Sequence, residues 1–522
     1  MNKDQRLPVH DRLQHIPIIV DNTPQQNSEE LHSLCDHGGE TAARADLDFE
    51  QLQPLKVIDG RRIVQVGGEL LVDADGLIEL DRLQTFPGEK LRNLDGRSSF
   101  PSPDRVGQYI SRTEFEKVPK FMAQWVHWPE RVRMVLEGRY HEIPPVHMEG
   151  IFTLVCNFMC PHCSRRVTRT EWVEGGTWEN SSEVERRNTM HPDDLKRVID
   201  QLAELRTDEQ MGIVWGGGDP TANPFSYDAM LYARKRGISA SFLTNGVFLD
   251  VDKCLEADPI LIRISLNCGT EEAYRKFHGY PRGWDHFDRV KGKMRELVKK
   301  KLERRARTLV GISLIMDERN LEDAVAAAEE IRAVVNEAGP GIDYVIVRPV
   351  FQYSTTRHTR LQLGTKAKAQ ALISEGGQIA RIIGSLGIPL IPIKDSYDLP
   401  PPPESYNDTR CLAYGICGEI RHNGDVQLCS DSYGNPEYTI GNLRDSSIRD
   451  IWNSSRRKEV LNRINAKECY KTHCPHNSRG HHFNRLFHQI EEMRVAGRIG
   501  EVERWISELR DVTYPMGHSF FV

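Results

Sequence analysis

The sequence predicts an α/β protein built around a partial barrel of six parallel β/α units. Between residues 147 and 393, short apolar runs alternate with helical stretches, which is typical of parallel strands joined by crossover helices. A module of β-hairpins and a helix is expected before this barrel, and a small cysteine-rich domain after it. The proline-rich segment DLPPPPESYNDT at 398–409 separates the barrel from that domain, because prolines resist both helix and central strand.

The strands of the barrel are predicted from apolar runs of five to eight residues. The six runs are EGIFTLV (149–155), MGIVW (211–215), ISASFLT (238–244), LIRISL (261–266), TLVGISLI (308–315) and DYVIVRPV (343–350), and a seventh, IPLIPI, spans 388–393. Helical patterns fall between the runs, as in DDLKRVIDQLAEL at 193–205, which has an apolar face. Pro192 suits the first turn of that helix, and Asp193 and Asp194 suit its positive end.

The parts of the chain outside the barrel have their own patterns. Residues 55–80 alternate β-rich runs with Asp-Gly and Gly-Gly turns, which predicts hairpins. Residues 113–138 have the spacing of a helix, with Phe121, Trp125, Trp128 and Val132 on one face. The expected division is a flexible arm (1–50), an accessory module (51–145), the barrel (146–397), a linker (398–410), a cysteine-rich domain (411–480) and a helical C-terminal segment (481–522).

Composition narrows the classes of protein to consider. With 39% hydrophobic and 28% charged residues, the 522-residue chain has the balance of a soluble globular protein. A net charge of −6 gives no reason to expect nucleic acid or an anionic membrane as partner. No apolar run approaches the roughly 18 residues that span a bilayer, and the N-terminus lacks a signal-peptide pattern. We therefore expect a cytoplasmic protein.

Three cysteines lie close together in CNFMCPHC at 156–163, directly after the first apolar run. Thiolates at this spacing can hold one compact cluster and leave the fourth iron of a [4Fe–4S] cube open to a small molecule. A zinc site is the alternative, but structural zinc normally takes four ligands. His162 is the residue that could be proposed as a fourth ligand, but it lies between two cysteines and is expected to point elsewhere.

This motif resembles the C-x3-C-x2-C signature of the radical SAM superfamily, in which an aromatic residue or His precedes the last Cys. The resemblance extends through residues 149–350. It implies that Cys156, Cys160 and Cys163 hold a [4Fe–4S] cluster to which S-adenosylmethionine (SAM) binds. It also implies reduction by a flavodoxin- or ferredoxin-type donor and cleavage of SAM to a 5′-deoxyadenosyl radical, which abstracts hydrogen from a substrate.

Further segments at the ends of the predicted strands resemble the same family. WGGGDPT at 215–221 is similar to the family's GGEP segment, which contacts the SAM amino group, with Asp219 where the family has Glu. Either the side chain or the backbone carbonyls could make that contact. The residues that the resemblance implies near SAM are Gly216, Gly217, Gly218, Asp219, Pro220, Thr244, Asn245, Ser265, Asn267 and Arg348. For Ser265, Asn267 and Arg348, local structural hydrogen bonding is the alternative.

A second group of cysteines follows the linker. Cys411, Gly424 and Cys429, an IGN…IW segment and two later cysteines resemble the SPASM or twitch extension of radical SAM enzymes. The resemblance covers 411–475 and implies one auxiliary [4Fe–4S] cluster on Cys411, Cys429, Cys469 and Cys474, with Cys417 as an alternative ligand. A zinc site or buried thiols remain the competing interpretations.

The expected function is radical chemistry on a substrate. Cys268, just past the fourth predicted strand, could donate a hydrogen atom to a substrate radical, or it could be a small buried residue. The resemblance implies modification of a peptide or protein side chain, or else oxidation or rearrangement of a small metabolite such as a sugar, cyclitol or nucleoside. A non-catalytic iron–sulfur or zinc-binding protein is the alternative from another class, and it predicts no cleavage of SAM.

Overall fold

The computed structural model of the chain describes fourteen stretches of it. These are residues 56–58, 61–66, 69–72, 125–163, 187–205, 211–306, 308–349, 363–374, 376–388, 390–392, 410–412, 416–429, 435–464 and 478–512. The chain divides into two compact units, one made of Met1–Thr85 and Lys90–Phe100, the other of Phe86–Glu89 and Pro101–Val522.

The first unit contains a small antiparallel sheet. Its strands are β1 (Lys56–Ile58), β2 (Arg61–Val66) and β3 (Glu69–Val72), and they pair in chain order. β1 pairs with β2 and β2 with β3, each across a short connection. This pairing confirms the hairpins predicted from the Asp-Gly and Gly-Gly turns of this segment.

The second unit is organised around one long sheet. Seven strands lie side by side in chain order, and all their pairings are parallel: β4 (His147–Ile151), β5 (Met211–Trp215), β6 (Ile238–Thr244), β7 (Leu261–Ser265), β8 (Leu309–Met316), β9 (Tyr344–Pro349) and β10 (Leu390–Pro392). In the described residues the sheet ends at β10 on one side and at β13 on the other, so the barrel is partial. The six predicted strands and the seventh apolar run are all present.

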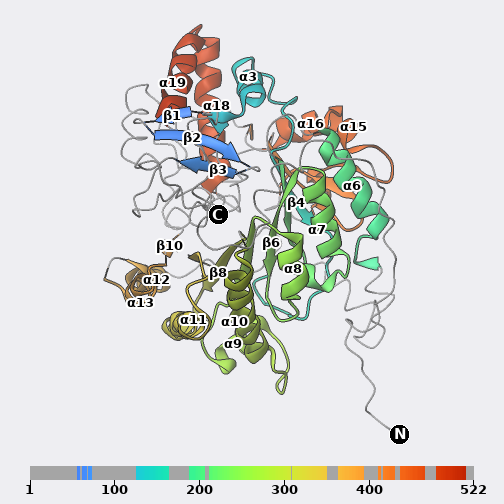
Figure 1. Cartoon of the computed structure of the whole chain (residues 1–522). Coiled ribbons are helices and arrows are strands. Elements are labelled where there is room, and N and C mark those ends of the chain that lie inside the picture. The colour runs from blue at the N-terminus through green and yellow to red at the C-terminus, as the bar shows by residue number, and fades with distance from the viewer. Residues whose placement is uncertain are drawn as a thin grey trace. The chain divides into compact units, whose positions relative to one another are not determined.

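Helices between the strands cover one side of this sheet (Figure 1). They are α6 (Pro192–Leu205), α7 (Ser226–Lys235), α8 (Val251–Ala257), α9 (Glu271–His278), α10 (His286–Arg304), α11 (Ala324–Ala338), α12 (Leu363–Ile373) and α13 (Gln378–Ser385). α6 begins at Pro192 as predicted. It buries Leu195, Val198, Ile199, Leu202 and Leu205, which are the apolar face read from its spacing.

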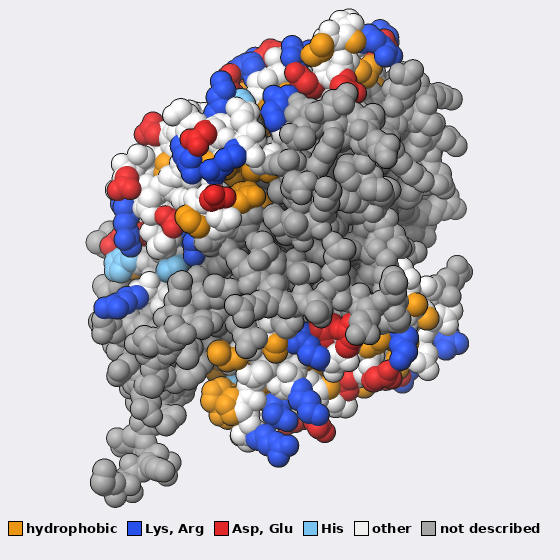
Figure 2. All heavy atoms as spheres, turned by 180° about the vertical axis from the view of Figure 1, so that it is seen from behind, with side chains coloured by type: hydrophobic (Ala, Val, Ile, Leu, Met, Phe, Trp, Pro, Cys, Tyr) orange, Lys and Arg blue, Asp and Glu red, His pale blue; other side chains and the backbone are white. Residues whose placement is uncertain are grey.

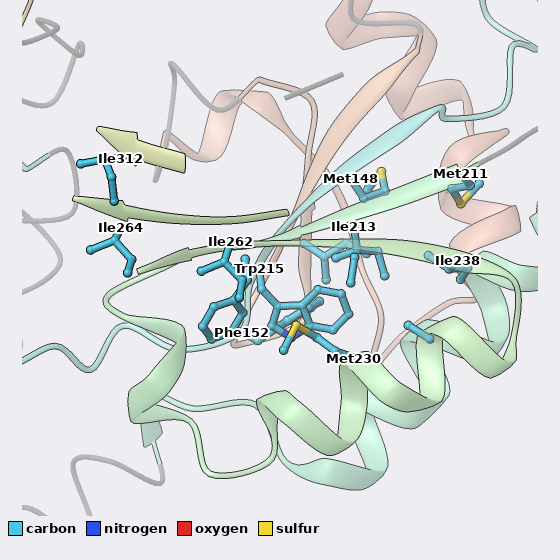
Figure 3. Close-up of a cluster of buried hydrophobic side chains, with 14 of the residues drawn as sticks. Met148, Phe152, Met211, Ile213, Trp215, Met230, Ile238, Ile262, Ile264 and Ile312 are labelled. Carbon is cyan, nitrogen blue, oxygen red and sulfur yellow. The ribbon is translucent and has the colours of Figure 1, made fainter. Parts of the chain in front are cut away.

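The main core lies between the sheet and these helices. Figure 3 shows Trp215 of β5 beside Met230 of α7 and Phe152. The rings of Phe152 and Trp215 meet edge to face, with centroids 5.5 Å apart. Because side chains alternate across a strand, residues next to the core-facing ones belong to the opposite face of the sheet. Arg263 and Ser265 of β7 are on that opposite face, which is therefore the more polar one.

The sheet continues beyond the barrel into the cysteine-rich domain. β11 (Cys417–Arg421) pairs parallel with β4 over five residues, and β12 (Asp425–Gln427) and β13 (Thr439–Asn442) follow antiparallel. Gly424 has φ +89° in the turn between β11 and β12, where the sequence HNGD predicts a hairpin. The expected domain boundary at 398–410 therefore separates two parts of one continuous sheet.

Helices α15 (Ile448–Trp452) and α16 (Ser455–Arg463) attach this extension to the segment before β4. The Trp452 indole donates to the Ile143 carbonyl at 2.8 Å. The buried Arg457 guanidinium lies 4.3 Å from the Trp452 ring and donates to the carbonyls of His141, Trp452 and Ile143.

Single turns of 3-10 helix occur at Pro220–Ala222, Leu321–Asp323 and Pro436–Tyr438.

Helix α3 (Pro129–Leu136) packs against α18 (Ser478–Val495), which in turn packs against α19 (Ile499–Val512). The Trp125 and Phe487 rings are 5.7 Å apart, and the Tyr140 hydroxyl donates to the Phe487 carbonyl at 3.1 Å. Within residues 125–138, the predicted helix at 113–138 is present as Pro129–Leu136, and residues 125–127 form a turn of 3-10 helix; residues 113–124 lie outside the described residues.

The surface of the described residues mixes charges of both signs. On the face in Figure 2, Lys and Arg side chains are interspersed with Asp and Glu. In the described residues, every helix is too short or too polar to cross a bilayer.

Candidate functional site

The loop that carries the first three cysteines leaves the C-terminal end of β4. Cys156 is buried, whereas Cys160 and Cys163 are partly exposed. The Phe158 backbone N–H lies 3.4 Å from the Cys156 sulfur, and the Cys163 N–H donates to the Cys160 carbonyl at 3.1 Å. The three closely spaced cysteines of the sequence therefore lie on one compact loop, as predicted.

The glycine segment after β5 supports this loop by direct backbone contact. The Gly218 N–H donates to the Thr153 carbonyl at 2.8 Å, and the Asp219 N–H donates to the Val155 carbonyl at 2.8 Å. A Cβ atom on Gly217 would lie 2.2 Å from the Thr153 oxygen, and one on Gly218 would lie 2.1 Å from the Val155 oxygen. Gly217 also has φ +125°, so both positions require glycine.

Asp219 connects the end of β5 with the end of β6. Its carboxylate is 2% exposed and accepts hydrogen bonds from the backbone and hydroxyl of Thr221, the Thr244 hydroxyl and the Asn245 backbone. Burial raises the pKa of the Asp219 carboxyl, and these donors oppose the rise. Since the side chain is occupied by protein donors, a contact of this segment with the SAM amino group would use backbone carbonyls.

Asn245 connects β6 to the cysteine loop. Its Nδ2 donates to Asn157 Oδ1 at 2.9 Å and lies 3.8 Å from the Cys156 sulfur, and its Oδ1 accepts from the Val247 N–H at 3.0 Å. The Asp219 carboxylate orients Asn245 by accepting from its backbone N–H at 2.7 Å. The TNG segment thus belongs to the same site as CNFMCPHC, as a support for the loop.

A histidine that the sequence analysis did not single out contacts the second cysteine. His278 is the last residue of α9, and its Nδ1 lies 3.4 Å from the Cys160 sulfur. Its Nε2 lies 3.4 Å from Asn267 Nδ2. Burial lowers the pKa of His278 well below its usual value, and the Leu266 carbonyl partly offsets this shift. No local sequence signal marks His278, because its contact joins residues 118 positions apart.

Asn267 forms hydrogen bonds that connect the end of β7 to its neighbouring strand. It is buried with φ +61°, and its Oδ1 accepts from the Ile315 N–H at 2.9 Å. Asn320 in turn donates to the carbonyls of Asn267 at 2.9 Å and Ile315 at 2.7 Å. Ser265 ends β7 opposite Ser313, and Arg348 lies on β9 opposite Ile315. For Ser265 and Arg348, a role toward SAM stays a prediction.

Cys268 and Cys254 are core residues. Both side chains have no exposed surface and belong to the main hydrophobic core. Burial raises the pKa of each thiol, so each remains protonated. This environment favours the structural interpretation of Cys268, and a role as hydrogen-atom donor stays a prediction.

Two cysteines of the second group, Cys417 and Cys429, lie at the opposite end of these strands from the cysteine loop. Cys417 is the first residue of β11 and pairs with His147, the first residue of β4. Cys429 follows antiparallel β12, whose end lies beside the start of β11. β4 alone spans about 13 Å at roughly 3.3 Å per residue, so Cys417 is well separated from Cys156. Cys411 is buried, and Cys469 and Cys474 lie outside the described residues.

Matches to known protein families cover both groups of cysteines. Residues 151–331 match the radical SAM superfamily, and residues 411–475 match the SPASM iron–sulfur cluster-binding domain. A curated relative, Fe-coproporphyrin III synthase of Methanosarcina barkeri (strain Fusaro / DSM 804), is 27% identical over 133 residues. That match covers 25% of this chain and 29% of the relative, so the chain spans less than a third of the curated protein that it matches.

Solved structures with a similar arrangement include Streptococcus suis SuiB bound to S-adenosylmethionine. It has 15% identity and a TM-score of 0.44, covering 64% of this chain and 71% of SuiB. BtrN in complex with AdoMet and 2-DOIA has 14% identity and a TM-score of 0.31, covering 63% of this chain and 89% of BtrN. Both TM-scores are below 0.5, so neither structure informs the substrate.

The class of protein follows from these matches together with the partial parallel barrel and the cysteine loop at the end of its first strand. The chain contains a radical SAM domain followed by a SPASM iron–sulfur cluster-binding domain. Its cofactors are accordingly a SAM-binding [4Fe–4S] cluster, SAM itself and auxiliary iron–sulfur.

The cysteine loop has the donor chemistry that such a cluster needs. N–H groups of Phe158 and Asn245 face the Cys156 sulfur, and His278 Nδ1 lies beside the Cys160 sulfur; a thiolate ligand accepts hydrogen bonds from such neighbours. In the described part of the chain, no three or more His, Cys, Asp or Glu side chains are arranged around a common point as metal ligands are.

Proposed function

We propose that this chain is a radical SAM enzyme whose Cys156, Cys160 and Cys163 hold the [4Fe–4S] cluster that binds SAM. Once bound and reduced, that cluster would supply the electron for cleaving a carbon–sulfur bond of SAM to methionine and a 5′-deoxyadenosyl radical, which would take hydrogen from the substrate. The observation that carries the proposal is the cysteine loop at the end of β4, supported by backbone and side-chain groups from β5, β6 and α9.

The residues around the loop position and shield it. The backbone contacts of Gly218 and Asp219 fix the segment before Cys156, and Asn245 fixes Asn157 within the loop. The aromatic rings of Phe158 and Tyr274 pack against His278 on its inner side. Such packing keeps water away from the His278 ring, which lies beside the Cys160 sulfur.

The SAM contacts remain part of this proposal. Backbone carbonyls of Gly216 to Pro220 would meet the SAM amino group, and Arg348 would meet its carboxylate by charge-assisted hydrogen bonds. The register places Ser265 and Arg348 on the same polar face of the sheet, the face opposite the helices. A flavodoxin- or ferredoxin-type protein would supply the electron.

The proposal is tested by release of 5′-deoxyadenosine. Anaerobically reconstituted protein with dithionite and SAM should release it, whereas the variant Cys156→Ala/Cys160→Ala/Cys163→Ala should not. Cys254→Ala is the matched control, because this buried core thiol lies outside the loop. Protein that holds its iron but releases no 5′-deoxyadenosine would favour a non-catalytic iron–sulfur protein.

Iron content tests the auxiliary cluster. Two cubes correspond to about eight irons per chain, so the triple alanine variant should keep about half of the iron. The ligands proposed for the auxiliary cluster are Cys411, Cys429, Cys469 and Cys474, with Cys417 as the alternative. Complete loss of iron from a folded triple variant would show that the two sites are not independent.

For the substrate, we propose a peptide or protein side chain. The extension of this chain resembles the SPASM domain, and enzymes of the SPASM type mostly modify peptides or proteins. A small polar metabolite is the second candidate, since Arg263, Ser265 and Arg348 belong to the polar face of the sheet. Deuterium-labelled candidate substrates distinguish the two. Label should appear in 5′-deoxyadenosine with the class of compound that is the true substrate, and with no other.

A further inference from the structure

The contact between His278 and Cys160 joins α9 to the cysteine loop. His278 is 2% exposed, and its Nδ1 lies 3.4 Å from the Cys160 sulfur. Its backbone carbonyl also accepts a hydrogen bond from the Met159 N–H at 3.0 Å. The same residue therefore holds both the backbone before Cys160 and the thiol itself.

Neighbouring hydrogen bonds determine which ring nitrogen carries the proton. The Ile315 N–H can only donate, so the Asn267 atom that it meets at 2.9 Å is Oδ1. Asn267 Nδ2, a donor, then faces His278 Nε2 at 3.4 Å, and Nε2 must accept. The proton of a neutral ring is left on Nδ1, which faces the Cys160 sulfur.

The other tautomer fits less well. It would leave Asn267 Nδ2 without an acceptor on His278. It would also bring the donor groups of Asn267 and His278 face to face at 3.4 Å. The arrangement of Asn267 thus selects Nδ1–H.

Aromatic side chains prevent the ring from turning away. The rings of Phe158, Tyr274 and Phe277 lie 4.6, 4.3 and 5.4 Å from that of His278, centroid to centroid. A buried ring packed in this way keeps one rotamer. The N–H donor is therefore in place before any ligand binds.

We propose that His278 is a positioning residue that donates an N–H···S hydrogen bond to Cys160 and raises the reduction potential of the cluster this thiolate holds. The inference rests on the proposed function, because it requires Cys160 to be a cluster ligand. A hydrogen bond to a ligand sulfur draws electron density from the cluster and stabilises the charge added on reduction. Asn267 acts through His278 by selecting the tautomer.

The test compares two identical substitutions in one aromatic cluster. His278→Phe removes the donor. His286→Phe is the matched control, because His286 is also buried among these rings, 5.5 Å from Phe158, and has no hydrogen bond to a cysteine among the described residues. The measurement is a redox titration of reconstituted protein, following the electron paramagnetic resonance signal that changes when SAM is added.

At a fixed potential, the ratio of reduced to oxidised cluster should fall at least tenfold in His278→Phe, which is 59 mV for a one-electron couple. His286→Phe should keep the wild-type potential. His278→Gln, whose amide can still donate, should recover part of the shift. An unchanged potential in a His278→Phe protein with full iron content would overturn the inference.

Loss of iron from these variants also tests the inference. If His278→Phe loses its iron while His278→Gln keeps it, the donor is required and the inference stands. If both lose iron and His286→Phe does not, the ring acts only in packing and the inference fails. Absence of iron from wild-type protein reconstituted in parallel would instead refute the proposed function.

Discussion

At the scale of single residues, the site depends on polar groups that hold the cysteine loop from several strands. Asp219, Asn245 and Asn267 were all selected from the sequence as residues near SAM. In the structure, the polar side-chain atoms of all three are occupied by hydrogen bonds within the protein. The polar motifs at the strand ends therefore shape the loop, whatever contact their backbones make with SAM.

Asp219→Asn tests this supporting role. An amide nitrogen would replace one of the carboxylate oxygens, both of which face donors, so at least one donor would lose its acceptor. We expect a loss of about 1–3 kcal/mol in the free energy of unfolding. Thermal unfolding of the apoprotein and iron content after reconstitution are the measurements. Wild-type stability would contradict the role given to the carboxylate.

His286 predicts a pH dependence of stability. Its pKa is lowered to about 4, mainly by burial and then by Arg289, against about 6.5 when unfolded. The unfolded state then binds more protons between these values, so stability is present above pH 6.5 and is lost as the pH falls toward 4. The slope is at most about 1.4 kcal/mol per pH unit.

The measurement is urea unfolding of wild type and His286→Phe from pH 7.5 to 4.5. The difference in unfolding free energy between the two proteins should change in this window and stay constant above it. If the unfolding free energies of the two proteins differed by the same amount at every pH, His286 would not be buried in its neutral form.

At the scale of elements, patterns within one segment predict that segment well. The six apolar runs correspond to β4 to β9, and the seventh corresponds to β10; β5 and β6 match their runs, and the ends of the others differ by up to four residues. The first strand ends earliest, at Ile151, because the backbone after it turns to meet the glycine segment of β5. The predicted helix at 193–205 and the hairpin at HNGD are present as expected.

The attachment of the cysteine-rich extension depends on Arg457. Arg457→Ala would remove the donor to the carbonyls of His141 and Ile143 and leave a cavity beside Trp452. We expect a loss of about 3 kcal/mol in the free energy of unfolding. Arg457→Lys keeps a charge but lacks the forked donor, so its loss should be smaller. Equal stability of Arg457→Ala and wild type in urea unfolding would contradict this attachment.

At the scale of the whole molecule, the parallel pairing of β4 with β11 makes the barrel and its extension one sheet. It also places Cys417 and Cys429 at the end of these strands opposite to the loop of Cys156, Cys160 and Cys163.

Removal of residues 410–522 tests the shared sheet. The truncation would expose the backbone of β4 along its whole edge, and unpaired strand edges associate with other chains. We expect aggregated or oligomeric protein by size-exclusion chromatography, with poor retention of iron at Cys156, Cys160 and Cys163. A monomeric truncated chain that still cleaves SAM would show that the barrel is independent of its extension.

The sequence by itself determined the order of strands and helices, the partial barrel, the three-cysteine loop at a strand end and the glycines beside it. These features depend on residues close together in the chain, whose spacing and conformational limits can be read directly. Only the tertiary structure decided that β11 pairs with β4, that Asp219 orients Asn245 and that His278 meets Cys160. Such contacts join residues far apart in sequence, so they depend on how whole elements pack, which no local spacing encodes.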